Sequence, residues 1–147
     1  MTELKTQPVL FEERRAANGA RIGVARLNAE KTLNALSLEM IDRLTERLAT
    51  WAVDAGVALV VLEGAGEKAF SAGADLHKVR ETMLLHHASA QRDDIRANTY
   101  AAGFFGREYR LDHTIHTYPK PVLCWGHGTA SSWAVAWACC PARAIAW

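Results

Sequence analysis

Strong charge of one sign, a disulfide framework and a long apolar run are all lacking in this 147-residue sequence. Its 17 basic and 16 acidic residues leave a net charge of +1, which gives no reason to expect nucleic acid or an anionic membrane as a partner. No apolar run approaches the roughly 20 residues of a membrane-spanning helix. The first residues lack the basic start and apolar stretch of a secretory signal. With only three cysteines, an odd number, we expect a cytoplasmic protein.

What the sequence does contain is enough apolar surface for one ordinary domain. Half of the residues are hydrophobic and 22% are charged, a balance that favours a globular core over disorder. Of the six histidines, His113 and His116 could share a helix face, but no Glu or Cys completes a metal-ligand set around them. We therefore expect no metal site.

The first half of the chain has the pattern of an α/β fold. Asn18-Gly19 between short apolar-polar runs at residues 9–13 and 21–27 predicts a β-hairpin. Ser37 can cap a helix over residues 37–53, in which apolar residues recur at helical spacing. The valine-rich run at residues 57–62 predicts a strand covered on both faces. The last three segments make a β-α-β unit.

The second half is expected to add helices and one strand. Residues 75–87 are interpreted as a helix, and residues 91–116 as mostly helical with an interruption at Gly103-Phe104-Phe105-Gly106. Residues 121–125, P-V-L-C-W, predict a further short strand. Four charged residues are interpreted as a solvated helix face: Arg107, Glu108, Arg110 and Asp112.

The stretch at residues 68–76, K-A-F-S-A-G-A-D-L, is the most informative motif. It joins the 57–62 strand to the helix that follows, and its small residues leave backbone N–H groups uncovered. Such groups suit a carbonyl oxygen on which negative charge develops. A plain tight turn explains the same residues, with Asp75 as a carboxylate that stabilises the helix start. The residues alone leave both interpretations open.

Two further segments point to a family. With the motif at 68–76 stand T-L-N-A-L at residues 32–36 and K-P-V-L-C-W-G-H-G at residues 120–128. In order, spacing and content the three resemble the enoyl-CoA hydratase/isomerase (crotonase) superfamily, over roughly residues 9–128. Residues 104–128 are similar to one branch of it, the 3-hydroxyisobutyryl-CoA hydrolases and their relatives.

This resemblance implies a spiral of stacked β-β-α turns, of which residues 1–128 would form the N-terminal portion, and an acyl-CoA ligand. It implies that the backbone N–H of Ala74 is one of two donors that polarise a thioester carbonyl. It requires no cofactor beyond the coenzyme A of the substrate, and it leaves a homo-oligomer open for the full-length parent. It further implies a set of residues along the CoA path, Ser71, Ala72, Gly73, Asp75 and Leu76, and basic residues for the CoA phosphates, Lys31, His77 and Lys78.

The sequence departs from the family after Gly128. There the family has a glycine run that supplies the second N–H donor, whereas no glycine follows Gly128 in this chain. Back-translating residues 130–147 and reading one base out of step gives I-V-M-G-G-G-V-G-L-L, which matches the family. We therefore interpret residues 129–147 as an out-of-frame tail, and we expect the second donor and the catalytic carboxylates to be absent.

The expected parent activity is hydrolysis of a 3-hydroxyacyl-CoA thioester, with 3-hydroxyisobutyryl-CoA as the substrate and this chain inactive as it stands. An enoyl-CoA hydratase or isomerase is the alternative, because it uses the same carbonyl-binding site. A non-catalytic fragment is the alternative of a different class. The resemblance leaves the acyl group open.

Overall fold

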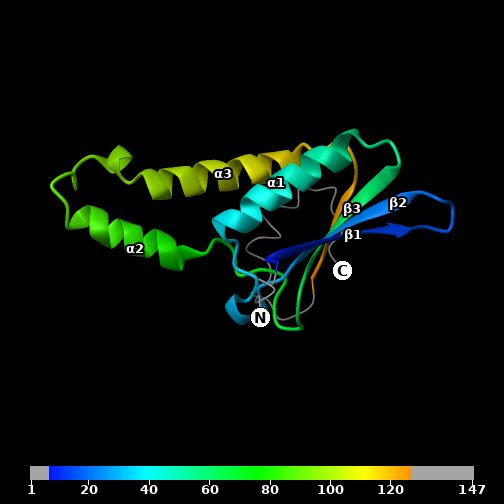
Figure 1. Cartoon of the computed structure of the whole chain (residues 1–147), viewed down its shortest axis with the longest axis horizontal. Coiled ribbons are helices and arrows are strands. Elements are labelled where there is room, and N and C mark those ends of the chain that lie inside the picture. The colour runs from blue at the N-terminus through cyan, green and yellow to red at the C-terminus, as the bar shows by residue number, and fades with distance from the viewer. Residues whose placement is uncertain (1–6, 127–147) are drawn as a thin grey trace, which may run out of the picture.

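The computed structural model describes residues 7–126, so the interpretation of residues 129–147 lies outside the described part of the chain. Four strands form one sheet in the order β1-β2-β3-β4, with helices packed beside it (Figure 1). Strand β1 (Val9–Arg15) pairs antiparallel with β2 (Arg21–Leu27). Strands β3 (Val57–Gly64) and β4 (Val122–Trp125) continue the sheet in parallel. The predicted hairpin, with Gly19 at a positive φ of 84°, is confirmed.

Helix α1 (Leu38–Val53) joins β2 to β3 and confirms the predicted β-α-β unit. Ser37 caps it, because its hydroxyl accepts a hydrogen bond of 3.2 Å from the Met40 N–H. The apolar residues at helical spacing are the ones that are buried: Met40, Ile41, Leu44, Leu48 and Trp51. This stripe supplies much of the hydrophobic core.

Strand β3 is covered less completely than its continuous apolar run predicts. Val57, Val60 and Leu62 are buried, whereas Leu59 and Val61 are half-buried and Ala58 is exposed. Side chains of a strand alternate between the two faces of the sheet. Ala58 is an extra residue in the pairing with β2, so Val57, Val60 and Leu62 share one face. The expectation of cover on both faces is therefore met on one face and only partly on the other.

The predicted break at Gly103–Gly106 is wrong. After helix α2 (Leu76–His87) and a short turn η2 (Ile95–Ala97), helix α3 runs unbroken over Thr99–His116. Each interior glycine costs a helix about 1 kcal/mol. Full burial of Phe104, which has 0% of its surface exposed, offsets that cost by about 1.5–3 kcal/mol.

The charged residues of α3 are not one solvated face. Arg107 and Arg110 are exposed, and Arg107 pairs with Asp42 of α1 at 2.7 Å. Glu108 and Asp112 are instead half-buried. Burial raises the pKa of Glu108, and the nearby charge of Asp112 raises it further. The solvated-face interpretation thus holds for the two arginines only.

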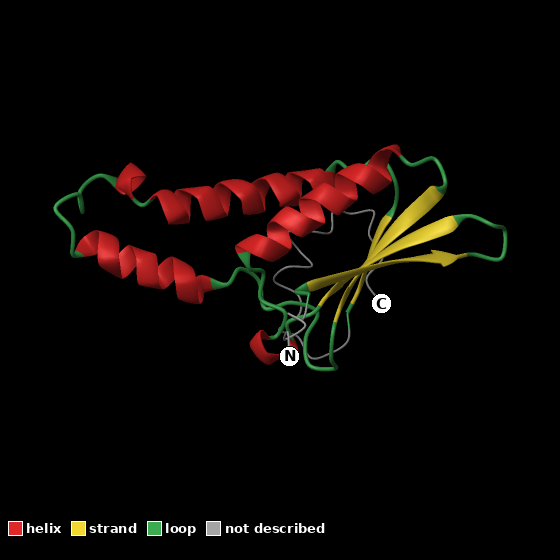
Figure 2. Cartoon of the chain, viewed as in Figure 1, coloured by secondary structure: helices red, strands yellow, loops and turns green. Residues whose placement is uncertain are grey.

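Helices α2 and α3 extend beyond the sheet as a two-helix arm, while α1 and α3 lie side by side (Figure 2). Helix α3 is anchored by Phe104, Leu111 and Ile115, all buried. Helix α2 buries only Val79. Within residues 7–126 no helix is long and apolar enough to span a membrane.

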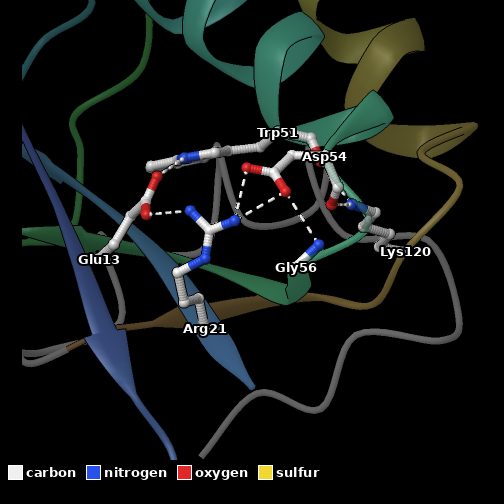
Figure 3. A network of polar contacts seen from close by, with 6 residues as sticks. All are labelled: Glu13, Arg21, Trp51, Asp54, Gly56 and Lys120. Atoms are coloured by element: carbon white, nitrogen blue, oxygen red, sulfur yellow. Dashed lines mark hydrogen bonds and ion pairs between the residues drawn. The ribbon is translucent and has the colours of Figure 1, made fainter. Parts of the chain in front are cut away.

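A polar network braces the strands at the ends where β2 and β3 begin (Figure 3). The Arg21 guanidinium donates to Glu13 at 2.7 Å and to both carboxylate oxygens of Asp54 at 2.8 Å. The indole N–H of Trp51 donates to Glu13 at 2.9 Å. The hydrogen bonds from Trp51 and then Arg21 hold the pKa of Glu13 below its usual range. This network ties the hairpin to the end of α1.

Lys120, just before β4, completes the brace. Its ammonium donates to the backbone carbonyls of Trp51 and Asp54 at 2.5 and 2.6 Å. Those carbonyls lie at the C-terminal end of α1, where the helix dipole favours a cation. The Tyr118 hydroxyl donates to the Leu48 carbonyl at 2.6 Å, and burial raises the pKa of Tyr118 to about 12. Three strands are thus fixed to one helix end.

Candidate functional site

The loops that follow β2 and β3 meet at the opposite end of the sheet and pair through their backbones. The two segments are residues 33–36 and residues 72–75. The Ala72 N–H donates to the Leu33 carbonyl at 2.8 Å, and the Leu36 N–H to the Gly73 carbonyl at 2.7 Å. The Asp75 N–H donates back to the Leu36 carbonyl at 3.0 Å. These bonds form an isolated parallel bridge between Leu36 and Ala74.

The bridge leaves the Ala74 N–H available. In a parallel bridge the N–H and C=O of one residue bond to the neighbours on either side of its partner, so the partner's own groups point away. Leu36 here bonds Gly73 and Asp75. Among residues 7–126 nothing accepts a hydrogen bond from the Ala74 N–H. Within the described part of the chain, the loop thus holds one backbone donor that has no acceptor.

Ser71 and Gly73 shape this loop from inside. The Ser71 side chain is fully buried; its hydroxyl donates to the Asn34 carbonyl at 2.8 Å and accepts from the Gly73 N–H at 3.2 Å. Gly73 has a positive φ of 90°, a conformation that favours glycine. Both residues fix the course of the backbone just before Ala74.

Helix α2 begins directly after the donor. Asp75 is its N-cap, and the carboxylate accepts a hydrogen bond of 3.1 Å from the His77 N–H. The tight-turn interpretation of Asp75 therefore describes its side chain correctly. The positive end of the α2 dipole lies beside Ala74, which favours negative charge there.

A cavity of about 830 Å³ opens beside Ala74. Its size suits a small-molecule ligand, and hydrophobic side chains of α2 and α3 form much of the wall. Lys31, His77 and Arg80 add basic groups, and Asp75 is the one acidic residue in the lining. The lining comes from the loop after β2 (Lys31, Thr32, Ala35), the segment before α2 (Ala72, Ala74, Asp75), α2 itself (Leu76, His77, Val79, Arg80, Met83, Leu84, His87) and α3 (Phe105).

The structure gathers most of the residues that the sequence nominated. Six of them line this cavity: Lys31, Ala72, Ala74, Asp75, Leu76 and His77. Ser71 and Gly73 lie behind the wall. Lys78 is exposed on α2 and pairs with Glu81 at 2.7 Å, a hydrogen bond that raises the pKa of Lys78. No group of three or more His, Cys, Asp or Glu residues in the described part of the chain could hold a metal ion.

Asn34 is the important residue that the sequence did not nominate. It lies in the quoted T-L-N-A-L segment, is buried, and adopts a positive φ of 55°. Its side chain hydrogen-bonds three backbone groups, one in its own loop and two in the loop after β3. Arg80 and Phe105 were likewise not nominated. Their spacing on α2 and α3 gives no signal, because the cavity forms only when the helices come together.

Comparison with known proteins fits this geometry. The family model for enoyl-CoA hydratase/isomerase matches residues 22–130, which include both paired loops and α2. The chain belongs to this family. The expected crotonase superfamily membership and the expected fold class are thereby confirmed.

Curated crotonase relatives place the chain near one branch. It is 38% identical over 115 residues to the mitochondrial 3-hydroxyisobutyryl-CoA hydrolase of Danio rerio, covering 78% of this chain and 26% of the relative. It is 36% identical over 106 residues to the Homo sapiens protein of that name, covering 72% of this chain and 25% of the relative. The chain thus spans about a quarter of the length of these curated relatives. The expected cytoplasmic location stays a prediction.

Solved structures of related enzymes superpose on this chain. A crystal structure of an enoyl-CoA hydratase from Rhodobacter sphaeroides 2.4.1 superposes with a TM-score of 0.65 at 27% identity, over 82% of this chain and 32% of that one. A carnitinyl-CoA dehydratase from Mycobacterium thermoresistibile gives 0.64 at 33% identity, over 83% of this chain and 31% of that one.

Proposed function

We propose that this chain binds an acyl-CoA thioester in the cavity beside α2 and hydrogen-bonds its carbonyl oxygen through the Ala74 N–H. The observation that carries the proposal is the Ala74 N–H at a cavity wall, which has no acceptor among residues 7–126. Membership of the family and the names of the relatives, which act on CoA thioesters, supply the ligand class.

The physical gain comes from placing a fixed donor where negative charge develops. A thioester carbonyl becomes an oxyanion during hydrolysis or an enolate during proton abstraction. Losing one such donor costs about 2.7–4 kcal/mol of transition-state stabilisation. The N-terminus of α2 adds a favourable dipole at the same place.

The remaining residues then have separate tasks. Ala72, Asp75 and Leu76 form the wall along which the CoA moiety runs, and Ser71 and Gly73 shape the loop behind that wall. Lys31, which lines the cavity, contacts a CoA phosphate. Lys78 must leave Glu81 before it meets one. The reaction uses no cofactor besides the coenzyme A of its substrate.

We further propose hydrolysis of 3-hydroxyisobutyryl-CoA as the reaction of the parent enzyme, on the strength of the curated relatives. Hydration or isomerisation of an enoyl-CoA is the second candidate, which the names of the structural neighbours favour. The 147-residue chain alone is proposed to bind without turnover. No glycine follows Gly128, and the one cavity carboxylate, Asp75, is occupied as a helix cap.

Binding is tested by titrating the purified chain with 3-hydroxyisobutyryl-CoA and with free CoA in a calorimeter. The thioester should bind more tightly than free CoA. Ala74→Pro removes the N–H, although its ring also fixes φ and fills the place of the amide hydrogen, whereas Ala74→Ser keeps the N–H at similar size. Ala74→Pro should weaken thioester binding about fivefold, the worth of a hydrogen bond of about 1 kcal/mol.

Turnover is tested separately with a thiol reagent that detects released CoA, and with crotonyl-CoA followed by its enoyl absorbance. Absence of release supports binding without catalysis, and release from the hydroxyacyl substrate supports a hydrolase. Consumption of crotonyl-CoA favours the second candidate.

Equal binding by the Ala74→Pro and Ala74→Ser chains would refute the donor role of Ala74.

A further inference from the structure

Asn34 connects the loop after β2, in which it lies, to the loop after β3, at the end of the sheet that carries the cavity. Its side-chain carbonyl accepts the Ala29 N–H at 3.0 Å. Its side-chain amide donates to the carbonyls of Ala65 and Ala69 at 2.9 and 3.0 Å. Only 1% of Asn34 is exposed. A buried amide in this position satisfies groups that water does not reach.

The backbone of Asn34 is as constrained as its side chain. Leu33 and Asn34 have positive φ angles of 53° and 55° in succession. Asparagine adopts this left-handed conformation more readily than most residues, whereas leucine does not. Two such residues in a row reverse the chain, so that the backbone of residues 33–36 lies against residues 72–75.

Ser71 links Asn34 to the donor. The Asn34 backbone carbonyl accepts the Ser71 hydroxyl at 2.8 Å, and the same hydroxyl accepts the Gly73 N–H at 3.2 Å. Ala74 is the next residue. The direction of its N–H is therefore set through backbone bonds that begin at residues 33–36.

The loop from Gly64 to Phe70 packs tightly around the Asn34 side chain. A Cβ on Gly64 would overlap the Phe70 carbonyl, and it would lie 2.9 Å from both the Ala69 carbonyl and the Asn34 side-chain amide. The acceptors of the Asn34 amide are thus packed tightly around it. Their close approach makes the asparagine bonds hard to replace by water.

We propose that Asn34 is a positioning residue that orients the Ala74 N–H toward the thioester carbonyl. The inference rests on the proposed function for the role of Ala74 and adds the residue that holds it. Asn34 lines none of the cavity, so it acts through Ser71 and the paired backbone. Its substitution should alter the donor without removing any ligand contact.

Two substitutions separate the side chain from the backbone conformation. Asn34→Gly keeps the left-handed backbone but removes all three side-chain hydrogen bonds. Ser71→Ala removes only the link from the Asn34 carbonyl to Gly73, and it serves where Asn34→Gly fails to fold. Trp51→Phe is the control, because it removes one side-chain hydrogen bond at the far end of the sheet.

The readout is the backbone amide spectrum of the full ¹⁵N-labelled chain. The ligand is a ketone analogue of isobutyryl-CoA in which CH₂ replaces the thioester sulfur, so that it cannot be hydrolysed. In the wild type the Ala74 amide should shift on binding. Asn34→Gly should abolish that shift and weaken binding by up to about fivefold, the effect of losing the donor, and Ser71→Ala should reduce both effects. Trp51→Phe should preserve both even where it lowers the melting temperature more.

Failure of the inference and failure of the proposed function give different results. If the wild-type Ala74 amide does not respond to the analogue, the proposed function fails. The ligand-free spectra still test the positioning role. Asn34→Gly and Ser71→Ala should move the Ala74 and Leu36 amides, and they should speed hydrogen exchange of the Leu36 amide, which is bonded to the Gly73 carbonyl. Unchanged Ala74 and Leu36 amides in both variants would overturn the inference.

Discussion

The two ends of the parallel strands are held in opposite ways. Where β2, β3 and β4 begin, charged side chains do the bonding: Arg21 clamps Asp54 and Glu13, and Lys120 caps α1. Where β2 and β3 end, the loops bond backbone to backbone. One end is held mainly by long charged side chains, and the other by backbone pairing together with the short side chains of Asn34 and Ser71.

This difference shows where the molecule can carry a site. Long side chains at the braced end satisfy the backbone groups near them, and they keep the sheet and α1 together. Backbone pairing at the other end leaves every second N–H pointing outward, and one of these belongs to Ala74. Strained conformations persist only where the surrounding structure fixes them, and the braced sheet supplies that support.

The largest loss of stability should come from removing the Trp51 side chain, which lies in the core at the braced end. Trp51 is 1% exposed, and Trp51→Ala removes the indole that packs on Phe11 and bonds Glu13. We expect a loss of about 3–5 kcal/mol in the free energy of unfolding, measured by urea denaturation. The conservative Trp51→Phe should lose much less. A loss below about 1 kcal/mol for Trp51→Ala would mean that the brace does not anchor the core.

The next largest loss of stability should come from the end of the sheet that carries the cavity, where β2 and β3 end. In Gly64→Ala the new Cβ meets the Phe70 carbonyl, so the loop must shift. We expect a loss of about 1–3 kcal/mol in stability, as for overpacked sites, together with weaker binding of acyl-CoA. Calorimetric binding and thermal melts measure the two effects.

Gly126→Ala is the matched control for Gly64→Ala. Its Cβ would lie 3.5 Å from the Phe70 side chain, an ordinary contact. The control should therefore bind and melt like the wild type. If Gly64→Ala does so as well, the site end is not tightly packed.

The two ends also differ in how far the sequence predicts them. Helix α1 and its buried stripe follow from local periodicity, and a local run of small residues predicts uncovered backbone N–H groups before α2, whereas the role proposed for Ala74 comes from the family resemblance. The bonds of Asn34 do not follow from local sequence, because its acceptors lie 31 and 35 residues away. The pairing of Arg21 with Asp54, 33 residues apart, is hidden for the same reason. The break expected in α3 failed because burial of Phe104 outweighs local glycine propensity.

Acid should weaken the braced end selectively. Hydrogen bonds from Trp51 and Arg21 lower the pKa of Glu13 from 4.5, and bonds from the Gly56 N–H and Arg21 lower that of Asp54 from 3.8. A carboxyl with a lowered pKa in the folded state stabilises it above its ordinary pKa. That contribution is lost as the pH falls through the folded-state value. The melting temperature should therefore fall as the pH drops below about 4.5.

Two variants check the source of this acid dependence. Trp51→Phe removes the main cause of the shift at Glu13, and Asp54→Asn removes a titrating group. Each should start from a lower melting temperature at pH 7 and lose less of it on acidification than the wild type. An unchanged acid slope in both would assign the pH dependence to other carboxyls.

The smallest changes in stability should come from substituting two glycines that have open space around them. A Cβ on Gly19 or on Gly103 would meet nothing within 4 Å. Gly19 lies in the hairpin turn at the braced end with a φ of 84°, whereas Gly103 lies inside α3. Gly103→Ala should therefore stabilise the chain by about 0.5–1 kcal/mol. Gly19→Ala should destabilise it by about 1 kcal/mol through backbone strain alone.

Opposite signs from the same added methyl group would locate the difference in the backbone and not in packing. Thermal melts of the two single variants and of the double variant measure it, and the effects should add because the positions share no partner. Two shifts of the same sign would contradict this assignment. In that case the turn at Gly19 would not need its positive φ, and the hairpin would owe its register to the Arg21 network instead.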